Sequence, residues 1–396
     1  MGWCTTFDPD QFAAVAGGYL RSRLAENSVL LSVAEAARSR WHSRAAGRVP
    51  GSGPLFGWWE PPDGGEPRGA FLHDPAVPLL MSSHVPEMAA SLAATLTKMG
   101  RTVCGVDAPV DAADAFAAAW SQRAGATVRV HRHSRVYRLA RPGAAPARGT
   151  RALPGTGAWP PPEMPGSPGR LRVATAEDRR LLTRWLTAFA DETAERVGAP
   201  ADLAADLISY GGAVFWEVPQ KSGRHRDAGH HLAIPHYRDA AASSGEPVPQ
   251  PVALAALVHP VAGMVRISIV YTPPEYRRRG YAGSVAMAVG RAVLTGTLPG
   301  PAAPVEPGAP GGASGGASGV LGAAPGHGRV SVNEVVMLVD GNRPNHWASR
   351  LGFQLVSERA VLRFGPVTGP MPGLRKTGPM PRLPTGPLPR LPRLHR

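Results

Sequence analysis

Apolar residues recur at helical spacing near the start of the chain. Phe12, Val15 and Tyr19 follow one another at intervals of three and four residues, and apolar positions resume in the same way after Asn27. Residues so spaced lie on one face of a helix, which repeats about every 3.6 residues. The pattern predicts two helices within residues 10–45, with Asn27 as the cap between them.

Short apolar runs separated by turn residues come next. The runs 55–59 and 69–72 flank Asp63-Gly64-Gly65, which predicts a β-hairpin, and 78–81 predicts a third strand. The other elements expected in this half are a helix at 86–99, a strand at 102–106, a helix at 111–124 and a strand at 127–139. This mixture of elements indicates an α/β domain.

A second half begins after a segment dense in proline, glycine and alanine, 141–169, which is typical of an interdomain linker. Its first helix is announced by Thr175 with Asp178 three residues later, the spacing of a capping box. The elements expected in this half are strands at 171–174, 213–218, 252–258 and 264–271, a helix at 281–295, a strand at 334–339, a short helix at 344–351 and a closing strand at 353–364.

Two long insertions interrupt the second half. Segment 219–250 is polar, and 297–328 is a low-complexity run of glycine, alanine, proline and serine, so both are expected to be surface loops. The first insertion carries four histidines, His225, His230, His231 and His236. Because no cysteine or carboxylate accompanies them at fixed spacing, we expect solvated histidines rather than a metal site. The predicted organisation is a domain at 1–140, the linker 141–169, a domain at 170–365 and a tail at 366–396.

Composition narrows the class of protein. Cys4 and Cys104 are far apart in the sequence and have no partner at metal-ligand spacing, which excludes a disulfide framework and a zinc module. The first residues lack the basic-then-apolar order of a signal peptide, and no run approaches the roughly 18 apolar residues of a membrane span. We expect a protein of the reducing cytoplasm with no membrane partner.

The net charge of +14 raises the question of a nucleic-acid partner. The tail 366–396 alone contributes six positive charges and no negative one. A basic, proline-rich tail without periodicity adheres weakly to any polyanion, whereas specific recognition needs a folded basic face. We therefore expect no nucleic-acid partner beyond weak contacts through the tail.

The clearest chemical signal lies where the strand 264–271 gives way to a helix. The turn between them contains Arg277-Arg278-Arg279-Gly280, and Ala282 and Gly283 follow inside the helix. The first amides of a helix lack intrahelical partners and carry partial positive charge, so small residues there allow a pyrophosphate to approach. The alternative is an ordinary surface turn whose small residues pack the helix against the sheet.

The same residues carry a resemblance to a known family. The pattern Arg277-x-x-Gly280-x-Ala282 after a strand resembles the Gln/Arg-x-x-Gly-x-Gly/Ala signature of the GNAT superfamily of N-acetyltransferases, and the wider phrase 270–277 looks like a bacterial subgroup. Downstream, Asp340-Gly341-Asn342 and Leu351-Gly352-Phe353 are similar to the family's asparagine-containing loop and closing residues. The resemblance covers roughly 170–365.

The resemblance implies a mixed, mostly antiparallel sheet flanked by helices, with acetyl-CoA as cosubstrate. Its fourth and fifth strands splay apart, and the pantetheine lies along the fourth, here Arg266 to Tyr271. The residues implied in cofactor binding are Ile269, Val270, Tyr271, Arg277, Arg278, Arg279, Gly280, Tyr281, Ala282, Gly283 and Asn342. The first domain resembles a degenerate copy in which Met81-Ser82-Ser83-His84 replaces the Arg-rich turn, so we expect no cofactor there.

The implied reaction is direct attack of a primary amine on the acetyl thioester, with one group removing a proton and another protonating the thiolate. The family's usual acid, a tyrosine, is replaced here by Ala348. Tyr271, Tyr281 or a water substitutes for it, or the domain is a non-catalytic acyl-CoA sensor or scaffold. Glu192 and Glu217 are the candidate bases. The alternative for each is a carboxylate that is solvated or held in a salt bridge and takes no part in the reaction.

Aromatic residues at helical or strand spacing do not identify the acceptor. They are Trp185, Phe189, Phe215 and Trp216. We expect them in the core, where such residues usually lie. A small amine, an aminoglycoside-like molecule, an amino acid and a protein lysine all remain open as acceptors.

Overall fold

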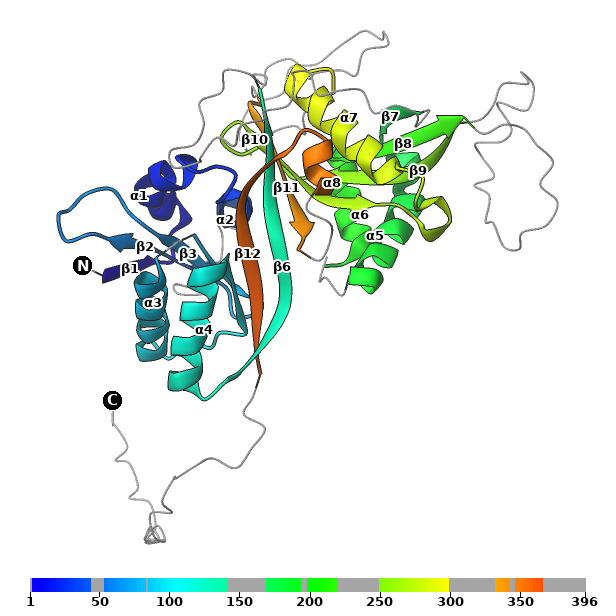
Figure 1. Ribbon diagram of the computed structural model, residues 1–396. Coiled ribbons are helices and arrows are strands. Elements are labelled where there is room, and N and C mark those ends of the chain that lie inside the picture. The colour runs from blue at the N-terminus through cyan, green and yellow to red at the C-terminus, as the bar shows by residue number, and fades with distance from the viewer. Residues whose placement is uncertain are drawn as a thin grey trace, which may run out of the picture.

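One sheet of 12 strands runs through the chain in the computed structural model (Figure 1). The structure describes residues 2–43, 53–82, 85–141, 169–193, 198–219, 249–298, 332–341 and 346–365. The strand order is β1-β2-β3-β4-β5-β12-β6-β11-β10-β9-β8-β7. Within the described residues, β4–β5 and β10–β11 pair in parallel and all other neighbours are antiparallel. This confirms the predicted mixed α/β fold with a mostly antiparallel sheet.

Each half of the chain contributes its elements in the same order. The first half contains β1 (Gly2–Thr6), α1 (Pro9–Arg21), α2 (Ser28–Ser43), β2 (Leu55–Glu60), β3 (Ala70–His73), β4 (Leu79–Met81), α3 (Pro86–Lys98), β5 (Gly105–Pro109), α4 (Val110–Ala124) and β6 (Thr127–Ala140). The second contains β7 (Arg170–Val173), η1 (Ala176–Asp178), α5 (Arg179–Thr193), α6 (Pro200–Ser209), β8 (Ala213–Pro219), β9 (Pro249–Leu257), β10 (Met264–Tyr271), η3 (Pro274–Tyr276), α7 (Tyr281–Thr295), β11 (Glu334–Asp340), α8 (His346–Arg350) and β12 (Gln354–Gly365). The shared order fits two copies of one fold.

Local signals start and separate the helices as the sequence predicted. Asn27 is buried and donates from its side chain to the carbonyl of Leu20, which ties the end of α1 to the start of α2. The capping box of Thr175 and Asp178 is present, although the first turn behind it is the 3-10 helix η1. Three elements, β1, α6 and the 3-10 helix η3, were not predicted. The first has only five residues, and the second begins at a proline without a side-chain cap.

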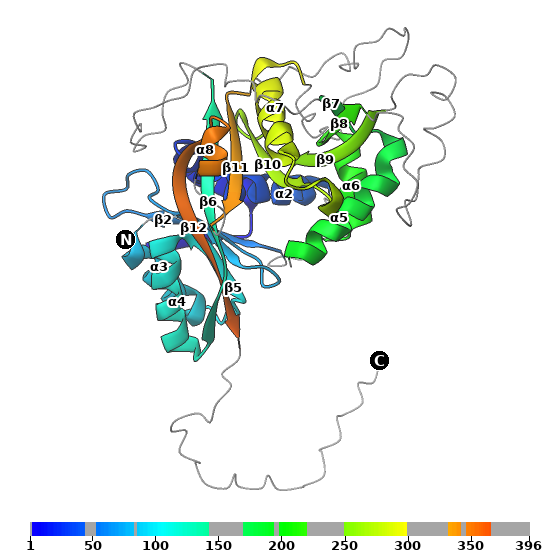
Figure 2. The ribbon, with the colours of Figure 1, turned by 45° about the vertical axis from the view of Figure 1, so that its right-hand side comes forward.

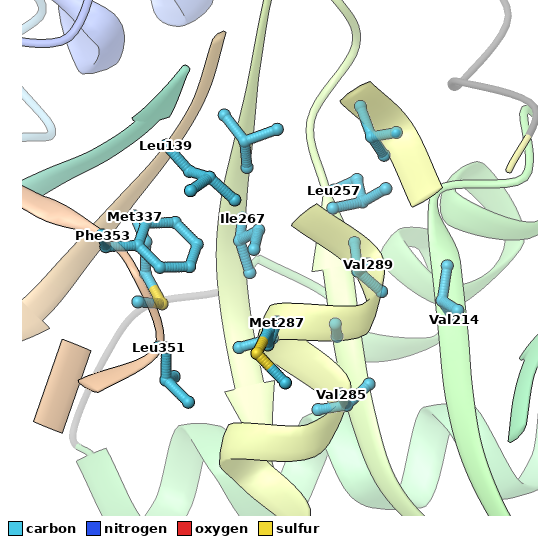
Figure 3. Packing of buried hydrophobic residues seen from close by; sticks show 14 of the residues in the cluster. Leu139, Val214, Leu257, Ile267, Val285, Met287, Val289, Met337, Leu351 and Phe353 are labelled. Atoms are coloured by element: carbon cyan, nitrogen blue, oxygen red, sulfur yellow. The ribbon is translucent and has the colours of Figure 1, made fainter. Parts of the chain in front are cut away.

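Helices cover both faces of the sheet in each half (Figure 2). In the first half, α3 and α4 pack on one face and α1 and α2 on the other. In the second half, α7 and α8 pack on one face and α5 and α6 on the other. Figure 3 shows Val285, Met287 and Val289 of α7 beside Ile267 and Leu257 of the strands. Because both faces are covered, central strands are buried on both sides, which suits their continuous apolar runs.

The two halves exchange their last strands. The closing strand β12 lies between β5 and β6, and β6 lies between β12 and β11. Ala360 of β12 thus pairs with Ala108 of β5, while Tyr137 of β6 pairs with Met337 of β11. The predicted strand at 353–364 exists, but it extends the sheet of the first half rather than closing the second by itself. The boundary at 141–169 therefore separates two halves of the sequence without separating two sheets.

The exchanged strand β12 carries a buried arginine into the first half. Arg359 is 4% exposed. Its Nε donates to Oδ1 of Asp107 at 2.9 Å, and its Nη2 donates to the backbone carbonyl of Asp107 at 2.9 Å. Longer contacts, each of 3.4 Å, lead from Arg359 to the carbonyls of Met81 and Glu26. The parallel pairing of β4 and β5 ends at Leu80 and Asp107, so the guanidinium lies where the two strands begin to part.

The strand exchange predicts that the two halves need one another. If residues 1–141 and 169–365 are produced as separate chains, we expect them to co-purify as a one-to-one complex, because β6 and β12 each pair with both halves. Size-exclusion chromatography with each fragment alone and mixed checks this. Two fragments that fold as independent monomers would contradict the exchange.

The buried pair predicts a large loss of stability on substitution. Arg359→Gln leaves the Asp107 carboxylate buried without its partner, and we expect the free energy of unfolding to fall by about 3–5 kcal/mol. The neighbouring Glu358→Gln is the control, because its ion pair with Arg135 involves a side chain that is 56% exposed, and should cost less than about 1 kcal/mol. Chemical denaturation of both variants measures the difference, and equal losses would show that Arg359 is not specially placed.

Candidate functional site

Strands β10 and β11 form a wedge that opens after four paired positions. Their pairing runs from Met264↔Glu334 to Ile267↔Met337, after which β10 pairs with β9 and β11 with β6. Among the described residues, the edge of β10 from Ser268 to Tyr271 has no strand partner on its β11 side. This confirms the splay that the family resemblance implied, and it narrows the free edge from the predicted start at Arg266. Such an edge offers amides and carbonyls to an extended ligand.

A bulge turns the side chains of β10 at the start of the free edge. The register against β9 shifts between Ile267 and Ile269, which leaves Ser268 as the extra residue. Ile267 packs in the core under α7, whereas Ile269 and Tyr271 pack with α5 and α6. Val270 contacts the α7 side. The predicted cofactor residues Ile269 and Tyr271 therefore point away from the helix that follows them in the chain.

The loop after β10 delivers the chain into α7 through two residues with positive φ. Arg278 has a φ of 64° and Gly280, the N-cap of α7, a φ of 84°. No side chain caps this helix, and a Cβ on Gly280 would meet no atom within 4 Å. No partner for the amides of Tyr281, Ala282 and Gly283 is found among the described residues. The helix thus begins as an open, partly positive amide site.

The three arginines of the loop have different surroundings. Arg277 donates from Nε to the carbonyl of Thr272 at 2.9 Å and forms a short ion pair with Glu192, so its guanidinium shapes the loop. Arg278 and Arg279 have no ion-pair partner in the described parts of the chain. Their charge is therefore available beside the open end of α7, whereas that of Arg277 is already shared with a carboxylate.

Glu192 links α5 to β10 and to the loop. Besides its pair with Arg277, it accepts a hydrogen bond of 3.0 Å from the hydroxyl of Tyr271. The Arg277 guanidinium also lies 5.9 Å from the centre of the Tyr271 ring. Burial and the hydrogen bond to Glu192 raise the pKa of Tyr271 to about 12, so the phenol is protonated at neutral pH. Two predicted catalytic candidates and one predicted cofactor residue thus form one network.

Glu217 has a different environment. Its side chain is 1% exposed, and its two oxygens pair with Arg170 at 3.3 Å and Arg172 at 2.5 Å. Arg172 also pairs with Asp178. Burial raises the pKa of the Asp178 carboxyl, but the hydrogen bonds from Arg172 and Thr175 together outweigh burial, so this pKa lies below its usual value. This network joins β7, η1 and β8, so the geometry of Glu217 supports its salt-bridged alternative over a role as base.

Most of the remaining predicted residues lie in the hydrophobic core. Ala348 is 1% exposed and packs in the core under α7, so α8 presents no hydroxyl at that position. Tyr281 is the first residue of α7 and is partly buried against the same core. Trp185, Phe215 and Trp216 are buried and Phe189 is partly buried, which confirms them as core residues. Asn342 and the four histidines of 219–250 lie outside the described residues.

The described ranges contain neither a metal-binding cluster nor a membrane-spanning helix. No group of three or more histidine, cysteine or carboxylate side chains is close enough to hold a metal ion. No helix there combines the length and the apolar character needed to cross a membrane. In the first half, the counterpart of the wedge between β10 and β11 is occupied by the guanidinium of Arg359.

The network of Glu192, Tyr271 and Arg277 was missed as a unit. Glu192 is 79 residues from Tyr271 and 85 from Arg277, and no spacing rule connects them. The only sequence signal was the presence of a carboxylate at the end of an amphipathic helix, α5.

Comparisons with known proteins give remote neighbours. No family model and no curated protein matches the chain. Among solved structures it is similar to a GCN5-related N-acetyltransferase from Sphaerobacter thermophilus, at 15% identity over 91% of this chain and 95% of that one, with a TM-score of 0.45. It is also similar to a tandem GNAT protein from the clavulanic acid biosynthesis pathway, at 12% identity over 92% and 99% with a TM-score of 0.39. At such low identities these neighbours assign no activity to this chain.

The network predicts how Tyr271 titrates. Because its folded-state pKa is raised above 10.0, the bond to Glu192 stabilises the fold below that pH and the contribution is lost as the pH rises through about 12. In Glu192→Gln we expect the pKa of Tyr271 to fall towards 10, although burial keeps part of the shift. Phenolate difference absorbance against Tyr271→Phe isolates this residue. The exposed Glu177→Gln, outside this network, is the control, and an unchanged titration in Glu192→Gln would show that the bond does not form.

Proposed function

We propose that this chain is an acyl-CoA-dependent N-acyltransferase that moves an acetyl group from acetyl-CoA to a primary amine. One observation carries the proposal: the free edge of β10 is followed in the chain, after one loop, by the uncapped amide end of α7. The only residues between them are those of the loop 272–280. An extended ligand with an anionic end would lie along Ser268–Tyr271 and place that end at α7.

The chemistry of coenzyme A suits this arrangement. Its pantetheine arm carries amide groups that need hydrogen-bond partners, and the edge of β10 supplies backbone groups of the same kind. Its pyrophosphate is an anion of the class that helix N-termini bind. The amides of Tyr281, Ala282 and Gly283 would hold it, and Arg278 and Arg279 would add charge. Gly280 leaves the approach free of a side chain.

The network at the end of β10 supplies groups for proton transfer. The amine nitrogen forms a bond to the acetyl carbon, the carbon–sulfur bond breaks, and β10 amides stabilise the carbonyl oxygen as charge develops. We assign removal of the amine proton to Glu192 and protonation of the leaving thiolate to Tyr271. Transfer of the proton from Glu192 to Tyr271 along their hydrogen bond then restores both groups.

We place the reaction in the reducing cytoplasm, because Cys4 and Cys104 are both free thiols.

Calorimetry with acetyl-CoA tests the cofactor site. Gly280→Asp puts a carboxylate at the proposed pyrophosphate position, and we expect the affinity to fall at least about tenfold, or ~1.4 kcal/mol. The control is Gly296→Asp at the other end of α7. Gly296 also has a positive φ, 73°, and a Cβ there would also meet nothing within 4 Å. No binding by the parent chain, or an equal effect of the two variants, would refute the assignment.

Ala348 favours a second candidate, an acyl-CoA sensor without turnover. The core position at α8 has no hydroxyl, so a catalytic acid must come from elsewhere. Thiol release from acetyl-CoA across a panel of primary amines separates the two functions. Turnover that is lost in both Glu192→Gln and Tyr271→Phe, with acetyl-CoA binding retained, would support the enzyme. Binding without thiol release for any amine would support the sensor.

A further inference from the structure

A cavity lies between helices α1 and α2 and the turn that joins β9 to β10. Its volume is about 270 Å³. The helices belong to the first half of the chain, and the turn, Val261–Ala262, belongs to the second. None of its lining residues belongs to the proposed cofactor site, although Ala262 lies six residues before Ser268, so binding in the cavity does not depend on that site.

The walls of the cavity are mostly apolar. Phe12 and Leu20 of α1 and Leu31 of α2 line it, and all three are at most 8% exposed. Val261 and Ala262 close the side formed by the turn. Ala262 and Gly263 have φ values of 53° and 79° and form a two-residue hairpin turn, because the backbones of Val261 and Met264 are hydrogen-bonded to each other. The walls suit the apolar part of a small molecule.

An arginine without a carboxylate partner lies on the cavity wall. A Cβ built on Gly17 would be 2.8 Å from Nη1 and 3.2 Å from Cζ of Arg21, so the guanidinium rests against the bare backbone of α1. Both residues line the cavity. In the described residues, Arg21 has no ion pair, whereas Arg38 on the same rim pairs with Glu35 at 3.0 Å and with Asp10 at 3.5 Å. Arg21 is exposed, and its charge is shared with no carboxylate among the described residues.

We propose that this cavity binds a small organic carboxylate with an apolar body, whose carboxylate pairs with the Arg21 guanidinium. A guanidinium offers two parallel donors that match a carboxylate, and the apolar walls exclude water from the rest of the ligand. The volume lies just below the roughly 300–1,000 Å³ typical of small-molecule pockets, which favours a ligand with a single ring or a short branched chain. This goes beyond the proposed transfer reaction, which uses other residues.

Three probes separate the two features of the ligand. Phenylacetate has both the charge and the apolar body, phenylacetamide lacks the charge, and acetate lacks the apolar body. By calorimetry we expect phenylacetate to bind at least about tenfold more tightly than either of the others. Equal binding of phenylacetate and phenylacetamide, or no binding of phenylacetate, would overturn the proposal.

Variants then test the assigned residues. Arg21→Gln should weaken phenylacetate about tenfold, and Ala34→Leu should weaken it by filling the cavity, which Ala34 lines. Gly17→Ala displaces the guanidinium without changing any charge. Its control is Gly18→Ala, the next residue of the same helix, where a Cβ meets nothing within 4 Å. Both alanines raise helix propensity alike, so only Gly17→Ala should lose affinity. Equal affinities of these two variants, or unchanged binding by Arg21→Gln, would contradict the role of Arg21.

Two further arms keep the outcome unambiguous. Gly280→Asp should bind phenylacetate as the parent chain does, so failure of the cofactor assignment and failure of this one are distinguishable. Size-exclusion chromatography of Ala34→Leu tests another occupant. A change in oligomeric state, together with no binding of any probe, would mean that the cavity receives a second copy of the chain, and the carboxylate proposal would be wrong.

Discussion

The antiparallel pairing of β6 with β12 is the contact on which the rest of the sheet depends. It lies at the centre of the strand order, with five strands on the β12 side and five on the β6 side. Each of these two strands also pairs with the half that did not produce it. Removing either strand would leave an unpaired edge in each half of the sheet, so the wedge of the second half and the helix layers of the first half depend on the same pair of strands.

The same exchange makes the two halves chemically unequal. In each half a parallel pair of strands stops early, at Leu80 and Asp107 in the first and at Ile267 and Met337 in the second. Arg359 fills the first opening, because β12 brings it there. The second opening has no such side chain in the described residues, and it adjoins the amide end of α7. One fold repeated twice thus yields one filled wedge and one free edge.

Most elements could be predicted because their causes are local. The spacing of Phe12, Val15 and Tyr19, the capping box at Thr175 and the runs beside Asp63-Gly64-Gly65 each act within a few residues. The strand order could not be predicted, because β12 has equivalent apolar patterns whether it pairs with β5 or β11. The site divides in the same way: the loop Arg277–Gly283 is visible in the sequence, whereas the partners of Glu192 and Glu217 are set by tertiary contacts.

The path of β12 also orders events in time. Arg359 and Asp107 are 252 residues apart in the chain, yet they share one buried ion pair. When the ribosome has made the first half of the chain, β12 does not yet exist. The edge of β5 that pairs with β12 therefore stays unpaired until almost the whole described chain has been made. Long-range closure of this kind slows folding and prolongs the exposure of a pairing edge. During synthesis the edge of β5 is therefore open to pairing with other chains for as long as the second half takes to be made.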